Sequence, residues 1–185
     1  MKSNYTEKAK AALLLAEKAA KKFHQSYVGT EHLLIGLLQE NTAIASKVLQ
    51  DNGVDYQKVQ EMIKDLIAPD TNVTVKERDG YSPKAQEVLE EASVQAERFG
   101  YEKIGTEHIL LALIKEADNV AVRMLNTIGV SCQKIYVDVL IAMGEDSGLY
   151  KADLAKTKGK SKQKSILEQY SRDLTQLAKD SRLDP

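Results

Sequence analysis

Apolar residues recur at three- and four-residue spacing through the first 145 positions, which predicts a series of amphipathic helices. The first predicted helix runs from Thr6 to Lys22, with Ala and Leu on one face and Thr6 as the expected N-cap. The next starts after Thr30 and is nearly all apolar, so we expect it to be the most buried. Polar or glycine-containing breaks separate the later predicted helices, which lie at 43–50, from Asp55 onward, and at 82–99, 106–116, 119–126 and 131–143.

The second half of this pattern repeats the first. The motif Gly29-Thr30-Glu31-His32 returns unchanged as Gly105-Thr106-Glu107-His108, 76 positions later, and the same offset aligns the surrounding residues without a gap. Roughly a third of about 65 aligned positions are identical, which is a strong signal of internal duplication. We therefore predict an all-α module of two tandem four-helix repeats, at 1–68 and 81–145, related by a pseudo-twofold axis and joined by a linker at 69–80.

The repeated motif has an ordinary structural interpretation as a helix start. Thr30 and Thr106 are expected N-caps, and Glu31 and Glu107 would then stand in the first turn, where the helix dipole favours a carboxylate. The preceding glycines permit a tight entry turn.

His32 and His108 follow these glutamates directly, but each repeat offers only one Glu-His pair. No second histidine one turn further on completes a zinc pattern, so we interpret both histidines as buried or capping residues and expect no metal site. They belong with Gly29 and Gly105 to the residues that support the two helix starts.

The composition of the chain argues against several classes of binding partner. Aromatic residues make up 5% of the chain and Trp is absent, which argues against a surface that stacks bases or sugars. Before Lys151 there are 17 basic and 22 acidic residues, so the folded part favours cationic partners over nucleic acid. Cys132 is the only cysteine, and the sequence shows neither a membrane-spanning apolar run nor a signal peptide. We expect a cytoplasmic protein that binds neither nucleic acid nor membrane.

The last 40 residues differ in character. The segment 146–164 is rich in lysine and lacks apolar periodicity, which predicts a flexible basic linker. Ser165 and Glu168 then fit a capping box, and an amphipathic helix is predicted over 165–185.

Residue patterns that carry catalysis are missing. No glycine-rich phosphate loop of the G-x-x-x-x-G-K-[ST] kind occurs, so this chain is not expected to hydrolyse ATP. Cys132 stands at a predicted helix start, which could activate a thiol, but a packing role is the simpler interpretation. We expect no enzyme activity and no cofactor in this segment.

Three repeated features resemble the Clp N-terminal repeat domain, and above all that of ClpC-type Hsp100 AAA+ unfoldases. They are the Tyr-Thr/Ser-x-Lys-Ala opening, the Val/Ile-Gly-Thr-Glu-His-Leu/Ile-Leu core and the Gly-Val helix stop, over residues 5–145. The segment 165–185 resembles the lead-in to the first ATPase module of that family. The resemblance implies a cytoplasmic unfoldase that uses ATP and Mg²⁺ in its other modules, delivers substrates to the ClpP peptidase, and captures unfolded proteins and MecA-type adaptors through this domain.

The resemblance also implies a receptor for phosphorylated arginine. Glu31 and Glu107 would accept guanidinium N–H groups, and a helix N-terminus would hold the phosphoryl oxygens. Thr6 and Ser82 each precede their glutamate by 25 positions and are the expected hydroxyl ligands. We therefore predict two phosphoarginine sites, Thr6 with Glu31 and Ser82 with Glu107.

Two other function classes remain open at this point. A stand-alone helical adaptor or regulator would use the same fold without binding phosphoarginine, and the lead-in segment argues against it because that segment makes sense only before an ATPase module. A catalytic domain is disfavoured by the missing nucleophile, metal and nucleotide motifs.

Overall fold

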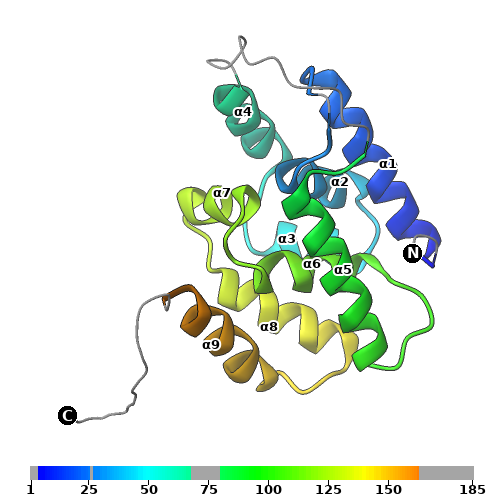
Figure 1. The fold of residues 1–185 in the computed structure, drawn as a ribbon, viewed down its shortest axis with the longest axis vertical. Coiled ribbons are helices and arrows are strands. Elements are labelled where there is room, and N and C mark those ends of the chain that lie inside the picture. The colour runs from blue at the N-terminus through cyan, green and yellow to red at the C-terminus, as the bar shows by residue number, and fades with distance from the viewer. Residues whose placement is uncertain (1–3, 26, 68–79, 163–185) are drawn as a thin grey trace. The chain divides into compact units, whose positions relative to one another are not determined.

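The computed structural model describes residues 4–25, 27–67 and 80–162. It separates into two units, residues 1–148 and 149–185. In the first unit the described residues form four helices in each predicted repeat (Figure 1), which confirms the all-α prediction. The first four are α1 (Glu7–Lys22), α2 (Thr30–Glu40), α3 (Ile44–Asp51) and α4 (Tyr56–Ile67). The second four are α5 (Pro83–Arg98), α6 (Thr106–Lys115), α7 (Val120–Ile128) and α8 (Cys132–Met143).

The long first helix of each repeat begins as the sequence predicts. Thr6 Oγ1 accepts a hydrogen bond from the Ala9 backbone N–H at 3.1 Å, and Ser82 Oγ accepts one from Ala85 at the same distance. Both hydroxyl residues are therefore N-caps, which satisfy a backbone donor that the helix itself leaves without an acceptor.

The short central helices begin one residue earlier than predicted. Gly29 and Gly105 are the N-caps of α2 and α6, so the assignment of Thr30 and Thr106 as N-caps is wrong. Both threonines are the first residues inside their helices and are buried at 2% exposure. The sequence pattern misled because a histidine three residues after each glycine accepts a hydrogen bond from the glycine N–H, so the helix start is fixed without a capping hydroxyl.

The two central helices form the core of the first unit, as their apolar composition predicts. α2 is buried along almost its whole length between α1 and the other repeat, and α6 occupies the matching place beside α5 (Figure 1). Gly36 permits the close approach of α1 and α2, because a Cβ at this position would lie 2.3 Å from the Ala12 carbonyl oxygen. The two helices thus meet backbone to backbone near their midpoints.

Two short backbone pairings join the repeats to each other. Tyr5, just before α1, forms an isolated parallel bridge with Ile104, just before α6. Val28, just before α2, forms the matching bridge with Tyr81, just before α5. The two bridges are related by the offset of 76 positions that relates the repeats, as the predicted pseudo-twofold arrangement requires.

The second unit corrects the prediction for the tail. Residues Leu149–Lys162 form helix α9, so a flexible linker over 146–164 is wrong for most of that range. Lysine, alanine and leucine are good helix formers, and a charged run without apolar periodicity can still be helical. The predicted helix at 165–185 and nearly all of the predicted linker at 69–80 lie outside the described residues. No helix within the described residues is long and apolar enough to cross a membrane.

Candidate binding sites at converging helix starts

The start of α2 is fixed by a hydrogen bond between a glycine and a histidine. The Gly29 backbone N–H donates to His32 Nδ1 at 2.9 Å, and Gly105 donates to His108 Nδ1 at the same distance in α6. Each histidine therefore takes the part of the glutamate or glutamine in a conventional capping box.

Both histidines are neutral and fully buried. Burial lowers the pKa of His32 and of His108 to about 4, because the charged imidazolium would lose its hydration. Since Nδ1 accepts a hydrogen bond, the proton of each neutral ring is assigned to Nε2, which is buried and has no hydrogen-bond partner among the described residues. The edge of Tyr101 packs on the His108 ring with 4.5 Å between ring centroids. These are the surroundings of structural histidines.

No group of three or more His, Cys, Asp or Glu side chains that could hold an ion was found among the residues described. Cys132 is equally unsuited to nucleophilic chemistry, because burial raises the pKa of its thiol to about 11.

Glu31 and Glu107 lie directly over the glycines that precede them. A Cβ built on Gly29 would stand 2.6 Å from Glu31 Oε1, and one on Gly105 would stand 2.5 Å from Glu107 Oε1. Burial raises the pKa of Glu31, and a hydrogen bond from its own backbone N–H partly offsets this shift. A half-buried carboxylate of this kind has lost part of its hydration and is suited to accept N–H groups from a cationic ligand.

The structure corrects the predicted pairing of Thr6 with Glu31. Gly36, in the middle of α2, packs opposite Ala12, and Lys8 near the start of α1 donates from Nζ to the Thr42 carbonyl oxygen beyond the end of α2. The two helices therefore run antiparallel. A 16-residue helix is about 24 Å long, so Thr6 and Glu31 lie near opposite ends of this pair.

Thr6 instead lies beside the helix start of the other repeat. The Thr6 backbone N–H donates to the Ile104 carbonyl oxygen at 3.0 Å, and Ile104 directly precedes the α6 motif that contains Glu107. The start of α3 also reaches this place, through the hydrogen bond from Lys8 to Thr42 and through packing of α3 on α6. We call this convergence site A and define it by Thr6, Lys8 and Glu107.

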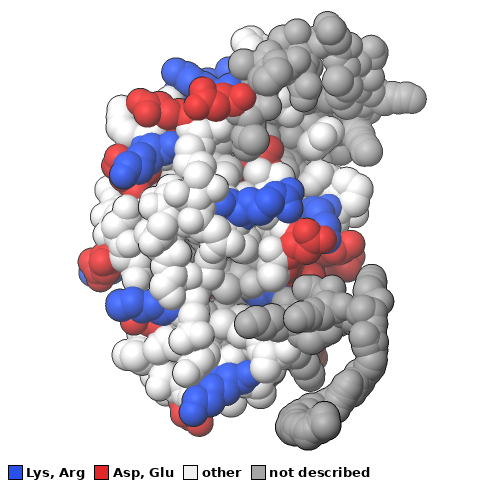
Figure 2. Space-filling model, turned by 90° about the vertical axis from the view of Figure 1, so that its left-hand side faces the viewer, with Lys and Arg blue, Asp and Glu red and all other residues white. Residues whose placement is uncertain are grey.

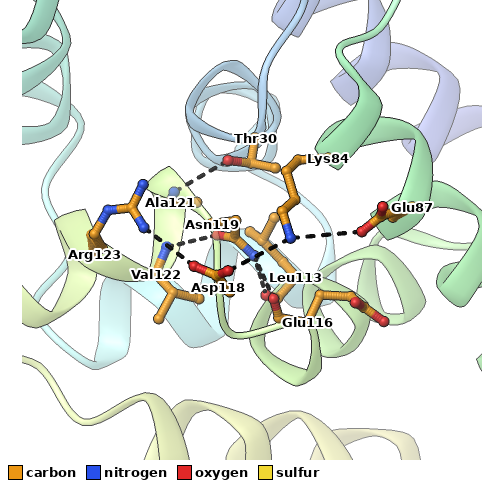
Figure 3. A network of polar contacts seen from close by, with 10 residues as sticks. All are labelled: Thr30, Lys84, Glu87, Leu113, Glu116, Asp118, Asn119, Ala121, Val122 and Arg123. Atoms are coloured by element: carbon orange, nitrogen blue, oxygen red, sulfur yellow. Dashed lines mark hydrogen bonds and ion pairs between the residues drawn. The ribbon is translucent and has the colours of Figure 1, made fainter. Parts of the chain in front are cut away.

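The equivalent convergence joins the starts of α5, α7 and α2. The Ser82 backbone N–H donates to the Val28 carbonyl oxygen at 2.9 Å, which places Ser82 beside the α2 motif that contains Glu31. Figure 3 shows Lys84 of α5 reaching toward Asp118, next to α7, and Thr30 of α2 bonded to Ala121 of α7. We call this convergence site B and define it by Ser82, Lys84 and Glu31.

Sequence reasoning overlooked Lys8 and Lys84 as site residues. They occupy equivalent positions, two residues after each hydroxyl cap, and each supplies an exposed cation at its site. The signal was present in the repeated opening, where lysine is identical in both copies. Whether this lysine belongs to a site depends on which helix starts lie next to one another in the fold, and the sequence alone does not give that arrangement.

The face of the molecule drawn in Figure 2 carries mixed charges. On the face drawn in Figure 2, basic and acidic side chains lie close to one another and leave broad uncharged areas between them. No continuous basic stripe covers the described part of this face.

Comparison with known proteins places this fold and sequence in one family. The family model "Clp repeat (R) N-terminal domain" matches residues 4–128 and 80–182. The whole chain is 37% identical to the chaperone protein ClpB of Oceanobacillus iheyensis and 36% identical to the negative regulator of genetic competence ClpC/MecB of Bacillus subtilis, spanning 23% and 22% of their lengths.

Solved structures show the same fold. The N-terminal domain of ClpD from Arabidopsis thaliana aligns with a TM-score of 0.61 at 22% identity, covering 76% of this chain and 97% of that one. A ClpV N-domain in complex with a VipB peptide aligns with a TM-score of 0.56 at 21% identity, covering 82% of this chain and 89% of that one. Together with the internal repeat and the two bridges between repeats, these matches show that the chain belongs to the Clp repeat N-terminal domain family, the N-terminal region of Clp/Hsp100 AAA+ chaperones.

Proposed function

We propose that this domain recruits substrates and adaptors for a cytoplasmic ClpC-like unfoldase, and that it does so by binding phosphoarginine at sites A and B. The observation that carries the proposal is the pair of parallel bridges, because they bring a hydroxyl cap from one repeat beside a glutamate helix start from the other. In the full-length protein, ATP-driven modules would unfold the captured substrate and pass it to ClpP, and MecA-type adaptors would dock on this domain.

The chemistry of phosphoarginine matches the groups that meet at each site. Its guanidinium N–H groups suit the half-buried carboxylates of Glu107 in site A and Glu31 in site B. Its phosphoryl oxygens need cations and donors, which Lys8 and Lys84 supply next to the hydroxyl caps. Unmodified arginine would lack the second set of contacts, and phosphoserine would lack the first.

Related domains support peptide capture by this fold. The ClpV N-domain, which shares the fold, has been solved with a VipB peptide. The Bacillus subtilis relative is named ClpC/MecB, which fits a ClpC-like parent protein, although the ClpB relative is as similar in sequence.

The proposal is tested by calorimetric titration of the domain with free phosphoarginine, with arginine and phosphoserine as controls. We expect saturable binding of phosphoarginine and none of either control. The variant in which Glu31 and Glu107 are both changed to Gln keeps the side-chain shape and should lose binding by more than about tenfold, since a charged hydrogen bond is worth about 1.5–3 kcal/mol. Absence of binding at millimolar phosphoarginine would contradict the proposal and leave recruitment through other surfaces.

A further inference from the structure

We propose that the two sites are unequal: site A is the strong phosphoryl-binding site, and carboxylates of the second repeat weaken site B. This inference rests on the proposed function. It comes from the differences between the repeats at the positions around Lys8 and Lys84, which the repeated motifs alone would leave equivalent.

The cations of site B already have anionic partners. Lys84 Nζ lies 3.7 Å from Glu87 Oε1 and 3.9 Å from Asp118 Oδ2, and Arg123 lies 3.5 Å from Asp118 Oδ1 (Figure 3). Each of these pairs is exposed and weak by itself, but together they place two carboxylates where a phosphoryl dianion would have to bind. A phosphoryl ligand at site B must displace these two carboxylates or bind against their repulsion.

The start of α7 in site B has also satisfied its backbone donors. Asn119 Oδ1 accepts a hydrogen bond from the Val122 N–H at 2.9 Å. Thr30 Oγ1 accepts one from the Ala121 N–H at 3.2 Å (Figure 3). Few N–H groups at this helix start therefore remain for a phosphoryl oxygen.

Site A lacks the two competing carboxylates. Thr42 stands at the position of Asp118, and Ala11 stands at the position of Glu87. Lys8 donates to the carbonyl oxygen of Thr42, and no described carboxylate lies within ion-pair distance of it. Glu7 lies near Thr6 and pairs with Lys10 at 3.5 Å. One other carboxylate, Glu40, lies at site A and accepts hydrogen bonds from the Thr42 and Ala43 N–H groups, where site B has both Glu87 and Asp118 beside Lys84. Site A is thus less negative than site B.

The start of α3 in site A keeps unused capacity for hydrogen bonds. The N–H of Ala43, the N-cap of α3, donates to Glu40 Oε1, but Ala43 has no side chain that accepts an N–H of the first turn, as Asn119 does in α7. Thr106 Oγ1, in the first turn of α6, is buried at 2% exposure and has no hydrogen-bond partner among the described residues, whereas the equivalent Thr30 is bonded to α7. The Thr106 hydroxyl and the first turn of α3 can therefore still bind a ligand at site A, whereas the equivalent groups at site B already have hydrogen-bond partners.

Glu40 shows that this region stabilises negative charge. Burial alone would raise the pKa of its carboxyl, but hydrogen bonds from Thr42 and the Ala43 N–H, with the nearby charge of Lys8, lower it instead. A phosphoryl group would meet the same cation and the same helix start, and would compete there with the single carboxylate of Glu40.

The test uses reciprocal exchanges at one pair of equivalent positions. Asp118→Asn removes the competing charge from site B without changing the side-chain size, and Thr42→Asp introduces one into site A, with Thr42→Asn as its neutral control. Both positions are exposed, so the fold should be unaffected, which thermal unfolding checks. Calorimetric titration with free phosphoarginine should resolve one strong and one weak step in the native domain.

We expect Asp118→Asn to raise the affinity of the weak binding step by about three- to tenfold, because it removes a nearby, partly screened negative charge. Thr42→Asp should weaken the strong step by a similar factor, and Thr42→Asn should not. Two equal steps in the native domain, unchanged by Asp118→Asn, would overturn this inference but leave the proposed function in place. Absence of phosphoarginine binding in both the native domain and Asp118→Asn would overturn both.

Discussion

His32 accepts a hydrogen bond at Nδ1 from the Gly29 backbone N–H, and the distance of 2.9 Å is the same for His108 and Gly105. This bond exists only while the ring is neutral, because a protonated imidazole has no acceptor. The starts of α2 and α6 therefore depend on two buried neutral histidines, each at the centre of a repeat.

This dependence predicts a loss of stability in mild acid. The folded pKa of each histidine is about 4 and lies below the ordinary value of 6.5, so the unfolded chain binds protons more readily. The contribution of the two histidines to the free energy of unfolding should be complete above about pH 6.5. It should fall by about 3 kcal/mol for each histidine as the pH drops toward 4. Urea unfolding between pH 4 and 8 measures this. Replacing both histidines with Gln, which can still accept from the glycine N–H, should flatten the acid limb; an unchanged limb would contradict the assignment.

Two glycines should respond very differently to alanine. Gly29 has an extended backbone that any residue adopts, and the three heavy atoms nearest to its added Cβ all belong to the end of the Glu31 side chain. Gly29→Ala should therefore displace the carboxylate and weaken ligand binding at site B with a small change in stability. Gly36→Ala would instead press on the backbone of Ala12 and should destabilise the fold by about 1–3 kcal/mol. Chemical denaturation together with phosphoarginine titration separates the two effects, and similar stability losses in both variants would contradict this interpretation.

The hydroxyl caps allow binding to be separated from capping. Ser82 and Ser131 are both N-caps, and each accepts a backbone N–H at 3.1 Å. Changing either to Ala should cost about 1 kcal/mol of stability. Only Ser82→Ala should also weaken phosphoarginine binding, because Ser131 caps α8 and belongs to neither site. Equal effects of both variants on binding would show that Ser82 acts through stability alone.

The two buried threonines at the helix starts should also differ. Thr30 Oγ1 accepts from the Ala121 N–H across the repeats, so Thr30→Val should leave a buried donor without a partner and cost about 1–3 kcal/mol. Thr106 Oγ1 has no partner among the described residues, so Thr106→Val should be nearly neutral in the absence of ligand. Thermal unfolding of the two variants measures the difference, and equal losses would contradict the asymmetry between the repeats.

Much of the fold was predictable because helices leave local signals. Thr6 and Ser82 were recognised as caps from their positions before apolar-periodic segments, and the offset of 76 residues predicted two equivalent repeats. Gly29 was missed as a cap because its partner is a histidine, which sequence rules do not associate with capping. The tail helix α9 was missed because its charge suggested disorder.

The composition of the sites was less predictable for a physical reason. Identical spacing of Thr6 from Glu31 and of Ser82 from Glu107 suggested sites within each repeat. Spacing along an antiparallel helix pair says little about proximity, and the bridges between repeats join Tyr5 to Ile104 and Val28 to Tyr81, which are more than 50 positions apart in each case. Such long-range pairing leaves no periodic trace in a single sequence.

The central claim, that each site takes its hydroxyl cap from one repeat and its glutamate from the other, is tested most directly by nuclear magnetic resonance. Backbone amide shifts would be followed during titration with phosphoarginine in the native domain, Glu107→Gln and Glu31→Gln. We predict that Glu107→Gln abolishes the response of amides at the start of α1 and preserves it at the start of α5, and that Glu31→Gln does the reverse. Loss of the α5 response in Glu107→Gln, with the α1 response intact, would contradict sites shared between the repeats.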